Sequence, residues 1–175
     1  MRFNPKSKIE GACKRSETRY AMTSVLLRAD ARVAELVATD GLILAIVPCE
    51  LDEGEHVPHG DANPLLLPPE ALAEARKQRA KSQPNAHLAI NGKTAKCLNG
   101  AEFPYREGAF PRVDDVLPSG VPVVKVGLDV GLLKRLADAI STDGKLTMEF
   151  HGPHAPVKAT GDLGTGVCMP FNTRK

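Results

Sequence analysis

The chain has 175 residues, of which 42% are apolar and 25% charged, a composition typical of a folded domain with a hydrophobic core. Its formal net charge is only +2, so it lacks the large basic excess of an ordinary nucleic-acid-binding domain. The four cysteines stand far apart, which argues against a zinc ribbon or a thioredoxin-type site. With no visible signal peptide or membrane-spanning run, we expect a cytoplasmic protein with no membrane partner.

The first part of the chain predicts a set of β-strands behind a polar start. Residues 1–18 are polar and basic without a sustained period, and we expect a basic arm or an irregular edge segment there. Three strands are expected next, at residues 20–28, 32–39 and 43–49. Asp40 and Gly41 stand between the last two, and an Asp-Gly pair between apolar runs predicts a tight hairpin. An acidic connection rich in Gly, Pro and His follows at residues 51–63.

The second part predicts one helix between short strands. A strand at residues 65–67 leads into a helix that begins at residues 68–70 and ends near Lys81. Proline at the start and cations in the last turn both favour a helix here. Asn-Gly turns then separate three further strands, at residues 87–91, 94–98 and 101–106.

The third part repeats this plan. After a proline-rich crossing at residues 110–120, a strand at residues 123–128 precedes a helix at residues 130–140. Asp129 is the expected N-cap, and the leucines that follow have helical spacing. Three strands come next, at residues 145–150, 157–160 and 166–169. The second and third parts each contain a strand, a helix and three strands, whereas the first part shows only the three strands.

Three short segments, taken in order, resemble the bacterial sliding DNA clamp, the beta subunit of the replicative DNA polymerase. They are VATDGLILA at residues 37–45, FPRVDDVLP at residues 110–118 and GVCMPF at residues 166–171. The resemblance implies an α+β, DNA-clamp-like fold of repeated strand-helix-three-strand units, with helices packed on antiparallel sheets. It also implies that the protein is not an enzyme and needs no cofactor, because a clamp encircles duplex DNA and holds other proteins there.

The resemblance also implies a domain organisation. Residues 19–118 look like most of the family's middle domain without its leading strand and helix, and residues 119–175 look like the second half of its last domain. Residues 1–18 remain the basic arm. A conventional clamp ring contains twelve such half-domain units. This chain offers roughly three, so four copies would supply the same number, and we expect a homo-oligomer.

The family binds partner peptides in an apolar cleft. The matching positions here are Thr39, Gly41, Leu42, Ile43, Leu44, Leu117, Pro118, Val167, Cys168, Met169, Pro170 and Phe171. Walls of this kind suit short hydrophobic motifs of replication or repair proteins. The family has His-Arg where Leu42 and Ile43 stand, and an Arg where Asn172 follows Phe171, so the polar rim of the cleft is lost. This loss indicates a changed partner or a subunit interface.

Duplex DNA inside a ring is held by Lys and Arg side chains that face phosphates, independently of sequence. The candidates are Arg76, Lys77, Arg79, Lys81, Lys134 and Arg135. For the first four, a DNA-binding face and a solvated helix face are equally good explanations. The last two are offset by Asp129 and Asp138, which favours a solvated face.

Two other functional classes stay open. One is a clamp-fold binding module or regulator of a replication protein that does not form a ring, which the altered cleft favours. A remote one is a metal-dependent enzyme that uses two His-x-x-His pairs, His56 with His59 and His151 with His154. Each pair lies in a proline-containing loop, and no phosphate-binding loop or catalytic triad pattern accompanies them. We therefore expect neither catalytic residues nor a metal site.

Overall fold

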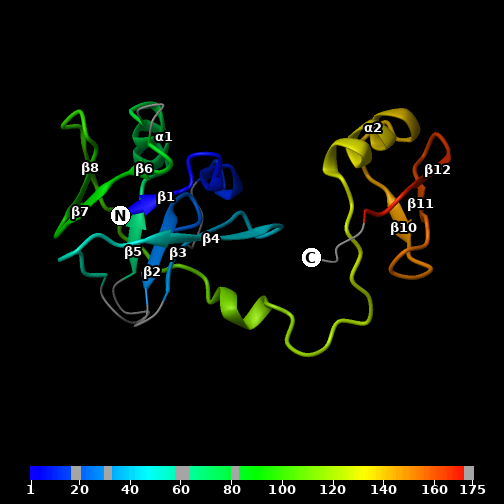
Figure 1. Cartoon of the computed structure of the whole chain (residues 1–175), viewed down its shortest axis with the longest axis horizontal. Helices are drawn as coiled ribbons and strands as arrows, with labels where there is room; N and C mark the ends of the chain where they lie inside the picture. Colours follow the sequence, from blue (N-terminus) through cyan, green and yellow to red (C-terminus); the bar gives the residue numbers. More distant parts are fainter. Residues whose placement is uncertain (17–20, 30–32, 58–63, 80–82, 172–175) are drawn as a thin grey trace. The chain divides into compact units, whose positions relative to one another are not determined.

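The computed structural model describes residues 1–16, 21–29, 33–57, 64–79 and 83–171. It divides into two compact units, unit 1 at Met1–Leu117 and unit 2 at Pro118–Lys175 (Figure 1). Both units combine helices with antiparallel strands, so the fold class is α+β as the sequence predicts. The division lies one residue before the boundary expected from the sequence.

Unit 1 contains two successive runs of elements with one plan, and we call each run a half-domain. The first consists of β1 (Arg2–Phe3), the 3-10 helix η1 (Ile9–Ala12), β2 (Val25–Ala29), β3 (Ala34–Thr39) and β4 (Leu44–Glu50). The second consists of β5 (Leu65–Leu67), α1 (Pro69–Lys77), β6 (Ala86–His87), β7 (Ala89–Asn91), β8 (Thr94–Lys96) and β9 (Glu102–Pro104). A second 3-10 helix, η2 (Val113–Val116), follows. Each half-domain thus has a leading strand, a helical segment and then a three-stranded meander, and in the second one the short strand β6 precedes the meander.

The two half-domains complete one another by exchanging their leading strands. The larger sheet has the order β5-β2-β3-β4-β1-β6, and β7-β8-β9 form a smaller one. β1 pairs with β6 of the second half-domain, and β5 pairs with β2 of the first. Each leading strand also pairs with the end of its own half-domain: β1 with β4, and Leu66 of β5 with Arg106 just after β9.

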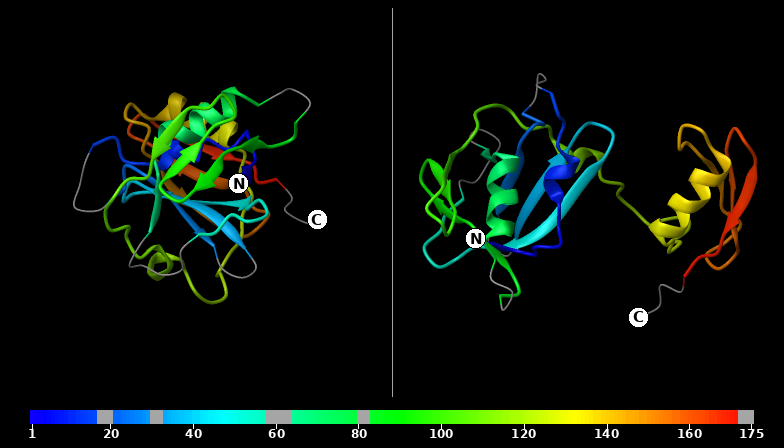
Figure 2. Two further views of the ribbon diagram at one scale, coloured as in Figure 1. Left: turned by 90° about the vertical axis from the view of Figure 1, so that its left-hand side faces the viewer. Right: turned by 90° about the horizontal axis from the view of Figure 1, so that it is seen from above.

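The hydrophobic core of unit 1 is shared by both half-domains. The first supplies Phe3, Leu27 and Leu36, and the second supplies Leu67, Leu72 and Leu88. α1 and η1 lie side by side against the larger sheet (Figure 2). α1 buries Ala71, Leu72 and Ala75 there because these residues recur on one helical face. Neither half-domain therefore has a core of its own.

The expected basic arm is wrong for residues 1–16, because the start of the chain is part of this sheet. β1 lies between β4 and β6, and Met1 is fully buried. The Met1 ammonium group donates hydrogen bonds to Asp52 at 2.8 Å and to the Leu88 carbonyl at 2.9 Å, and it also pairs with Glu55. A two-residue strand is too short to show a period. The first half-domain therefore has its leading strand, and η1 stands in place of its helix.

Unit 2 is a single half-domain. It contains α2 (Val130–Ile140), β10 (Thr147–Glu149), β11 (Val157–Thr160) and β12 (Thr165–Cys168), with the sheet order β10-β11-β12. Asp129 caps α2 as predicted, since its Oδ1 accepts the Leu132 N–H at 3.0 Å. Ile140 of α2 is buried, as are Val157 and Ala159 of the sheet, because α2 covers one sheet face.

Three expected elements differ from the structure. Residues 87–91 are divided between β6 and β7, which belong to different sheets. Residues 123–128 form no strand, and only Gly127 makes a bridge, with Phe171. α1 ends at Lys77, and Lys81 lies outside the described residues.

Candidate partner and DNA interfaces

The tip of the β3–β4 hairpin is fixed by side-chain hydrogen bonds. The Thr39 hydroxyl donates to the Ile43 carbonyl at 2.6 Å and accepts the Gly41 N–H at 3.1 Å. The Asp40 carboxylate accepts the N–H groups of Leu42 and Ile43, at 2.8 and 2.9 Å. Gly41 has a φ of 92°, a conformation that is favourable only for glycine. The Asp-Gly turn predicted from the sequence is therefore a rigid structure.

This turn presents apolar side chains to solvent. Leu42 is 93% exposed and Ile43 54%, whereas Thr39 is buried and Leu44 half-buried. The N–H groups of Ile43 and Leu42 hold the pKa of Asp40 below its usual value, because they stabilise the ionised carboxylate. The backbone is thus held in place without using the two apolar side chains, which remain available for a partner.

A recess of about 670 Å³ lies beside the hairpin tip. Leu42 and Met22 line it with apolar surface, and Lys14 and Arg15 line it with two positive charges, one of which the Asp40 carboxylate in the same lining offsets. Burial raises the pKa of the Cys13 thiol in the same recess to about 11, so this cysteine is un-ionised at neutral pH. Sequence reasoning missed the recess because it assigned residues 1–18 to an arm.

The second family-like segment is anchored to the larger sheet of unit 1. Val113 of η2 is buried. The Arg28 guanidinium contacts Asp114 at 2.8 Å and Glu35 at 2.9 Å, which joins η2 to β2 and β3. Leu117 follows η2 directly and is 43% exposed. Pro118 is also exposed and begins unit 2.

The third segment forms an apolar strip on unit 2. Val167, Met169 and Phe171 are 62%, 60% and 55% exposed. Cys168 points the other way and is buried, as strand alternation requires, so it is a core residue rather than a cleft wall. Pro170 is half-buried. The predicted cleft residues are therefore divided between the two units, with Thr39 to Leu44 and Leu117 in unit 1 and the others in unit 2.

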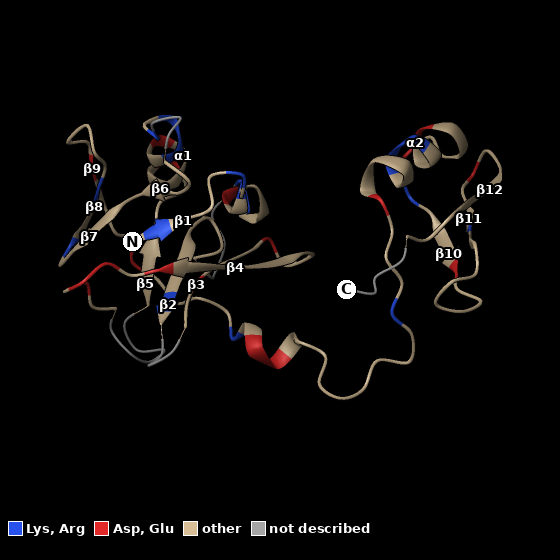
Figure 3. Ribbon diagram, viewed as in Figure 1, with Lys and Arg blue, Asp and Glu red and all other residues tan. Residues whose placement is uncertain are grey.

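The predicted DNA-contacting cations of α1 are not equivalent. Arg76 is only 15% exposed, because it pairs with Glu10 and donates to the Ser7 carbonyl at 3.2 Å. Lys77 is 75% exposed, with its Nζ 3.4 Å from Glu74. Arg79, beyond the end of the helix, donates to the carbonyl of Gln83. α1 therefore carries both acidic and basic residues (Figure 3), with Glu70 in its first turn and Arg76 and Lys77 in its last.

In α2, Lys134 and Arg135 both lie on the exposed side. Lys134 pairs with Asp138 one turn later, at 2.9 Å. Arg135 has no ion-pair partner within the part of the chain that the structure describes. Of the two, Arg135 is the side chain with an uncommitted charge.

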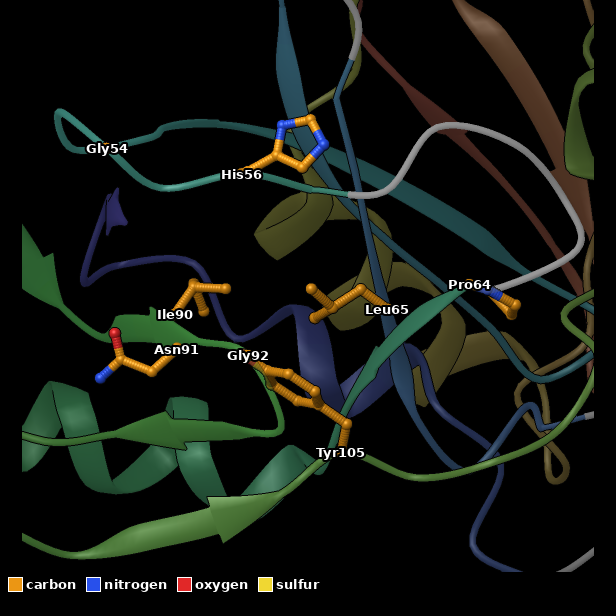
Figure 4. A pocket seen from close by; sticks show the side chains of 8 residues that line it. All are labelled: Gly54, His56, Pro64, Leu65, Ile90, Asn91, Gly92 and Tyr105. Carbon is orange, nitrogen blue, oxygen red and sulfur yellow. The ribbon is translucent and has the colours of Figure 1, made fainter.

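The histidine pairs do not form a metal centre within the described residues. His59 lies outside them, and His56 lines a recess of about 620 Å³ together with Asn91 and Tyr105 (Figure 4). The Nε2 of His151 is 3.8 Å from Glu149, and His154 is exposed. Over the described ranges, no three His, Cys, Asp or Glu residues are grouped to hold a metal ion. The helices in those ranges are also too short or too polar to cross a membrane.

Comparison with solved structures shows which proteins share this fold. The Caulobacter crescentus beta sliding clamp matches 96% of this chain with a TM-score of 0.68 and 21% identity. DNA polymerase III subunit beta of Borrelia burgdorferi matches 99% with a TM-score of 0.67 and 16% identity. The Bacillus subtilis DNA polymerase sliding clamp matches 97% with a TM-score of 0.66 and 16% identity.

These matches cover only 47%, 48% and 48% of the three solved chains, so this chain spans about half of their length. No protein-family model and no curated relative matches the sequence. The shared architecture confirms the predicted likeness at the level of fold. This chain has the fold of the bacterial DNA sliding clamps.

Proposed function

We propose that this protein is a clamp-like processivity or docking factor of DNA replication or repair. It contacts duplex DNA without sequence specificity, assembles as a homo-oligomer and holds partner proteins through short apolar motifs. It is cytoplasmic and catalyses no reaction. The observation that carries the proposal is the rigid hairpin tip, which presents Leu42 and Ile43 to solvent within a clamp fold.

The hairpin tip and its recess support the docking part. An exposed leucine and a half-buried methionine on a fixed backbone favour binding of short hydrophobic motifs, since the protein loses little conformational entropy on binding. Lys14 and Arg15 stand beside Leu42 in the recess. Their charge favours a motif that combines apolar residues with an acidic one. The polar rim lost at Leu42 and Ile43 is in this way replaced by cations from another segment.

The DNA part is supported by the remaining exposed cations. Lys77, Arg79 and Arg135 are the described candidates whose charge is least committed to a partner. Lys81, a further candidate, lies outside the described residues. With a net charge of only +2, a single copy offers few phosphate contacts. Binding should therefore be weak for one copy and fall steeply with salt.

The test compares nicked circular duplex DNA with the same DNA after linearisation. Retention on the circle at about 0.2 M salt, with loss from the linear form, supports a ring that encircles DNA. Equal, salt-sensitive binding to both forms supports a docking factor that contacts DNA from outside. An absence of binding even at about 0.02 M salt overturns the DNA role. That last outcome would favour the second candidate, a clamp-fold regulator that binds a replication protein.

A further inference from the structure

We propose that unit 2 pairs with unit 2 of a second copy of this chain. In this pairing each copy places its leading segment, residues 124–128, against the free edge of β10 in the other copy. The contact is reciprocal and isologous, as in most symmetric dimers. The two half-domains together would form one complete domain, with the strand exchange seen inside unit 1.

The first argument is that unit 2 repeats the second half-domain of unit 1. In unit 1 the Arg106 N–H donates to the Leu66 carbonyl at 2.9 Å, which ties the end of that half-domain to its leading strand. In unit 2 the Phe171 N–H donates to the Gly127 carbonyl, also at 2.9 Å. Leu66 and Gly127 each stand three residues before the first residue of their helix. Residues 126–128 are therefore the counterpart of β5.

The second argument is that both partners of the strand exchange are missing from unit 2. In unit 1 the other side of β5 pairs with β2, and β6 receives β1. Over the described residues, the segment before Gly127 pairs with no strand, and β10 pairs only with β11. Val124, within this segment, is 40% exposed although valine favours strands. An apolar segment and an open sheet edge of this kind tend to find a strand elsewhere.

The third argument comes from α2. Leu132 is the third residue of α2, as Ala71 is the third residue of α1. Ala71 is fully buried in the core shared by the two half-domains, whereas Leu132 is 45% exposed. Val130 beside it is 77% exposed. The apolar face of α2 therefore extends beyond what its own sheet covers, at the place where a second half-domain packs in unit 1.

The pattern in unit 1 also predicts the register of the contact. Because backbone groups of neighbouring residues point to opposite sides of a strand, the N–H of Val126 points away from the side on which Gly127 bonds Phe171. It therefore points toward the second copy. β5 pairs Leu66 with Leu26 of β2, and Met148 has the place in β10 that Leu26 has in β2. The equivalent pairs would set Gly127 opposite Met148, and Val126 opposite Glu149, of the other copy.

This inference deepens the assembly part of the proposed function and rests on self-association, but it does not depend on DNA binding. It gives the oligomer one defined interface, which unit 2 forms with unit 2 of a second copy. Two chains joined in this way would contain three complete domains. DNA retention and solution mass are separate measurements, so either proposal can fail while the other stands.

The first test is the solution mass of the full chain by light scattering, without DNA, at about 0.1 mM. We expect an even multiple of the 18.7-kDa chain. Val126→Pro removes the N–H aimed at the second copy and should halve the mass, whereas Val121→Pro, upstream of the pairing segment, should not. Leu132→Glu should halve the mass as well, with Leu163→Glu in the β11–β12 turn as the matched control. Unchanged circular dichroism shows that each variant is folded.

The second test traps the register. The double variant Val126→Cys with Glu149→Cys should form a covalent dimer under mild oxidation, and neither single variant should. A monomeric wild-type mass at about 0.1 mM, or a mass unchanged by both Val126→Pro and Leu132→Glu, would overturn the pairing. A stable dimer that binds no DNA would leave the pairing intact and overturn the DNA role.

Discussion

The guanidinium of Arg76 in α1 is paired with the carboxylate of Glu10 in η1, and one of its hydrogen bonds measures 2.9 Å. Both side chains are largely buried, at 15% and 18% exposure. The pair joins the helical segments of the two half-domains of unit 1. Arg76 thus has a structural partner, whereas Lys77, the next residue, has its charge in solvent.

Arg76→Ala should lower the free energy of unfolding by about 3 kcal/mol, because it leaves Glu10 buried without its partner. Lys77→Ala should change stability by less than about 0.5 kcal/mol. Affinity for duplex DNA should respond in the opposite order, with the larger loss for Lys77→Ala. Urea denaturation and a DNA titration at low salt measure the two quantities. A stable Arg76→Ala protein with weakened DNA binding would contradict the structural role of Arg76.

Leu42→Lys should abolish partner-peptide binding without unfolding the hairpin. Leu42 is 93% exposed, so its replacement should change stability by less than about 0.5 kcal/mol. Random peptides displayed on phage can be selected on the wild-type chain and then tested for binding to Leu42→Lys. We expect apolar peptides with an acidic residue, and at least about a tenfold loss on Leu42→Lys.

Leu163→Lys is the control for that selection, because Leu163 is also exposed but lies in unit 2, away from the hairpin. Peptides that lose binding equally on both variants would show that the hairpin tip is not the docking site.

Asp52 should make unit 1 sensitive to acid. Burial alone would raise the pKa of Asp52, but the hydrogen bond and charge of the Met1 ammonium outweigh it and hold this pKa below its usual value. The stabilising contribution is therefore complete above the unfolded pKa of about 3.9 and is lost as the pH falls through the lower folded pKa. Asp52→Asn should cost about 1–2 kcal/mol at pH 7 and much less near pH 2.5.

Denaturation of wild type and Asp52→Asn across this pH range measures the difference. Glu53→Gln, an exposed neighbour in the same segment, serves as the control. A gap between wild type and Asp52→Asn that stays constant down to pH 2.5 would be inconsistent with this account.

Gly161→Ala should destabilise unit 2, and Gly164→Ala in the same turn should not. A Cβ on Gly161 would lie 2.2 Å from the carbonyl oxygen of Ile140, whereas a Cβ on Gly164 meets nothing within 4 Å. That carbonyl accepts the Leu163 N–H at 3.0 Å and cannot move without loss of the bond. We expect a loss of about 2–3 kcal/mol for Gly161→Ala, measured by thermal unfolding at fixed protein concentration. Equal melting temperatures for the two variants would refute it.

The parts of the fold that local chemistry determines could be predicted from the sequence. Asp129 begins α2 because its carboxylate caps the first turn. Asp40 and Gly41 form the hairpin because Asp40 accepts an N–H group of the turn and Gly41 adopts the positive φ that the turn requires. The exposed Leu42 and Ile43 followed from that turn. Each of these features depends on residues only a few positions apart.

The parts that depend on distant pairing could not be predicted. β1 is two residues long, and its place in the sheet depends on β4 and β6, far along the chain. The recess beside Leu42 was missed for a similar reason, since Lys14 and Arg15 line it from a segment far from Leu42 in the sequence. Residues 123–128 have the composition of a strand but no partner among the described residues. A strand needs a neighbour, and the sequence does not show whether one is present.

The count of half-domains has a consequence for stoichiometry. Two lie in unit 1, where they pair with each other, and one lies in unit 2. Because each unit 2 pairs with one other unit 2 in the contact proposed above, the pairing is complete only when the number of chains is even. Trimers and pentamers would always leave one β10 edge open and prone to further growth. Only assemblies with an even number of chains can therefore pair every unit 2.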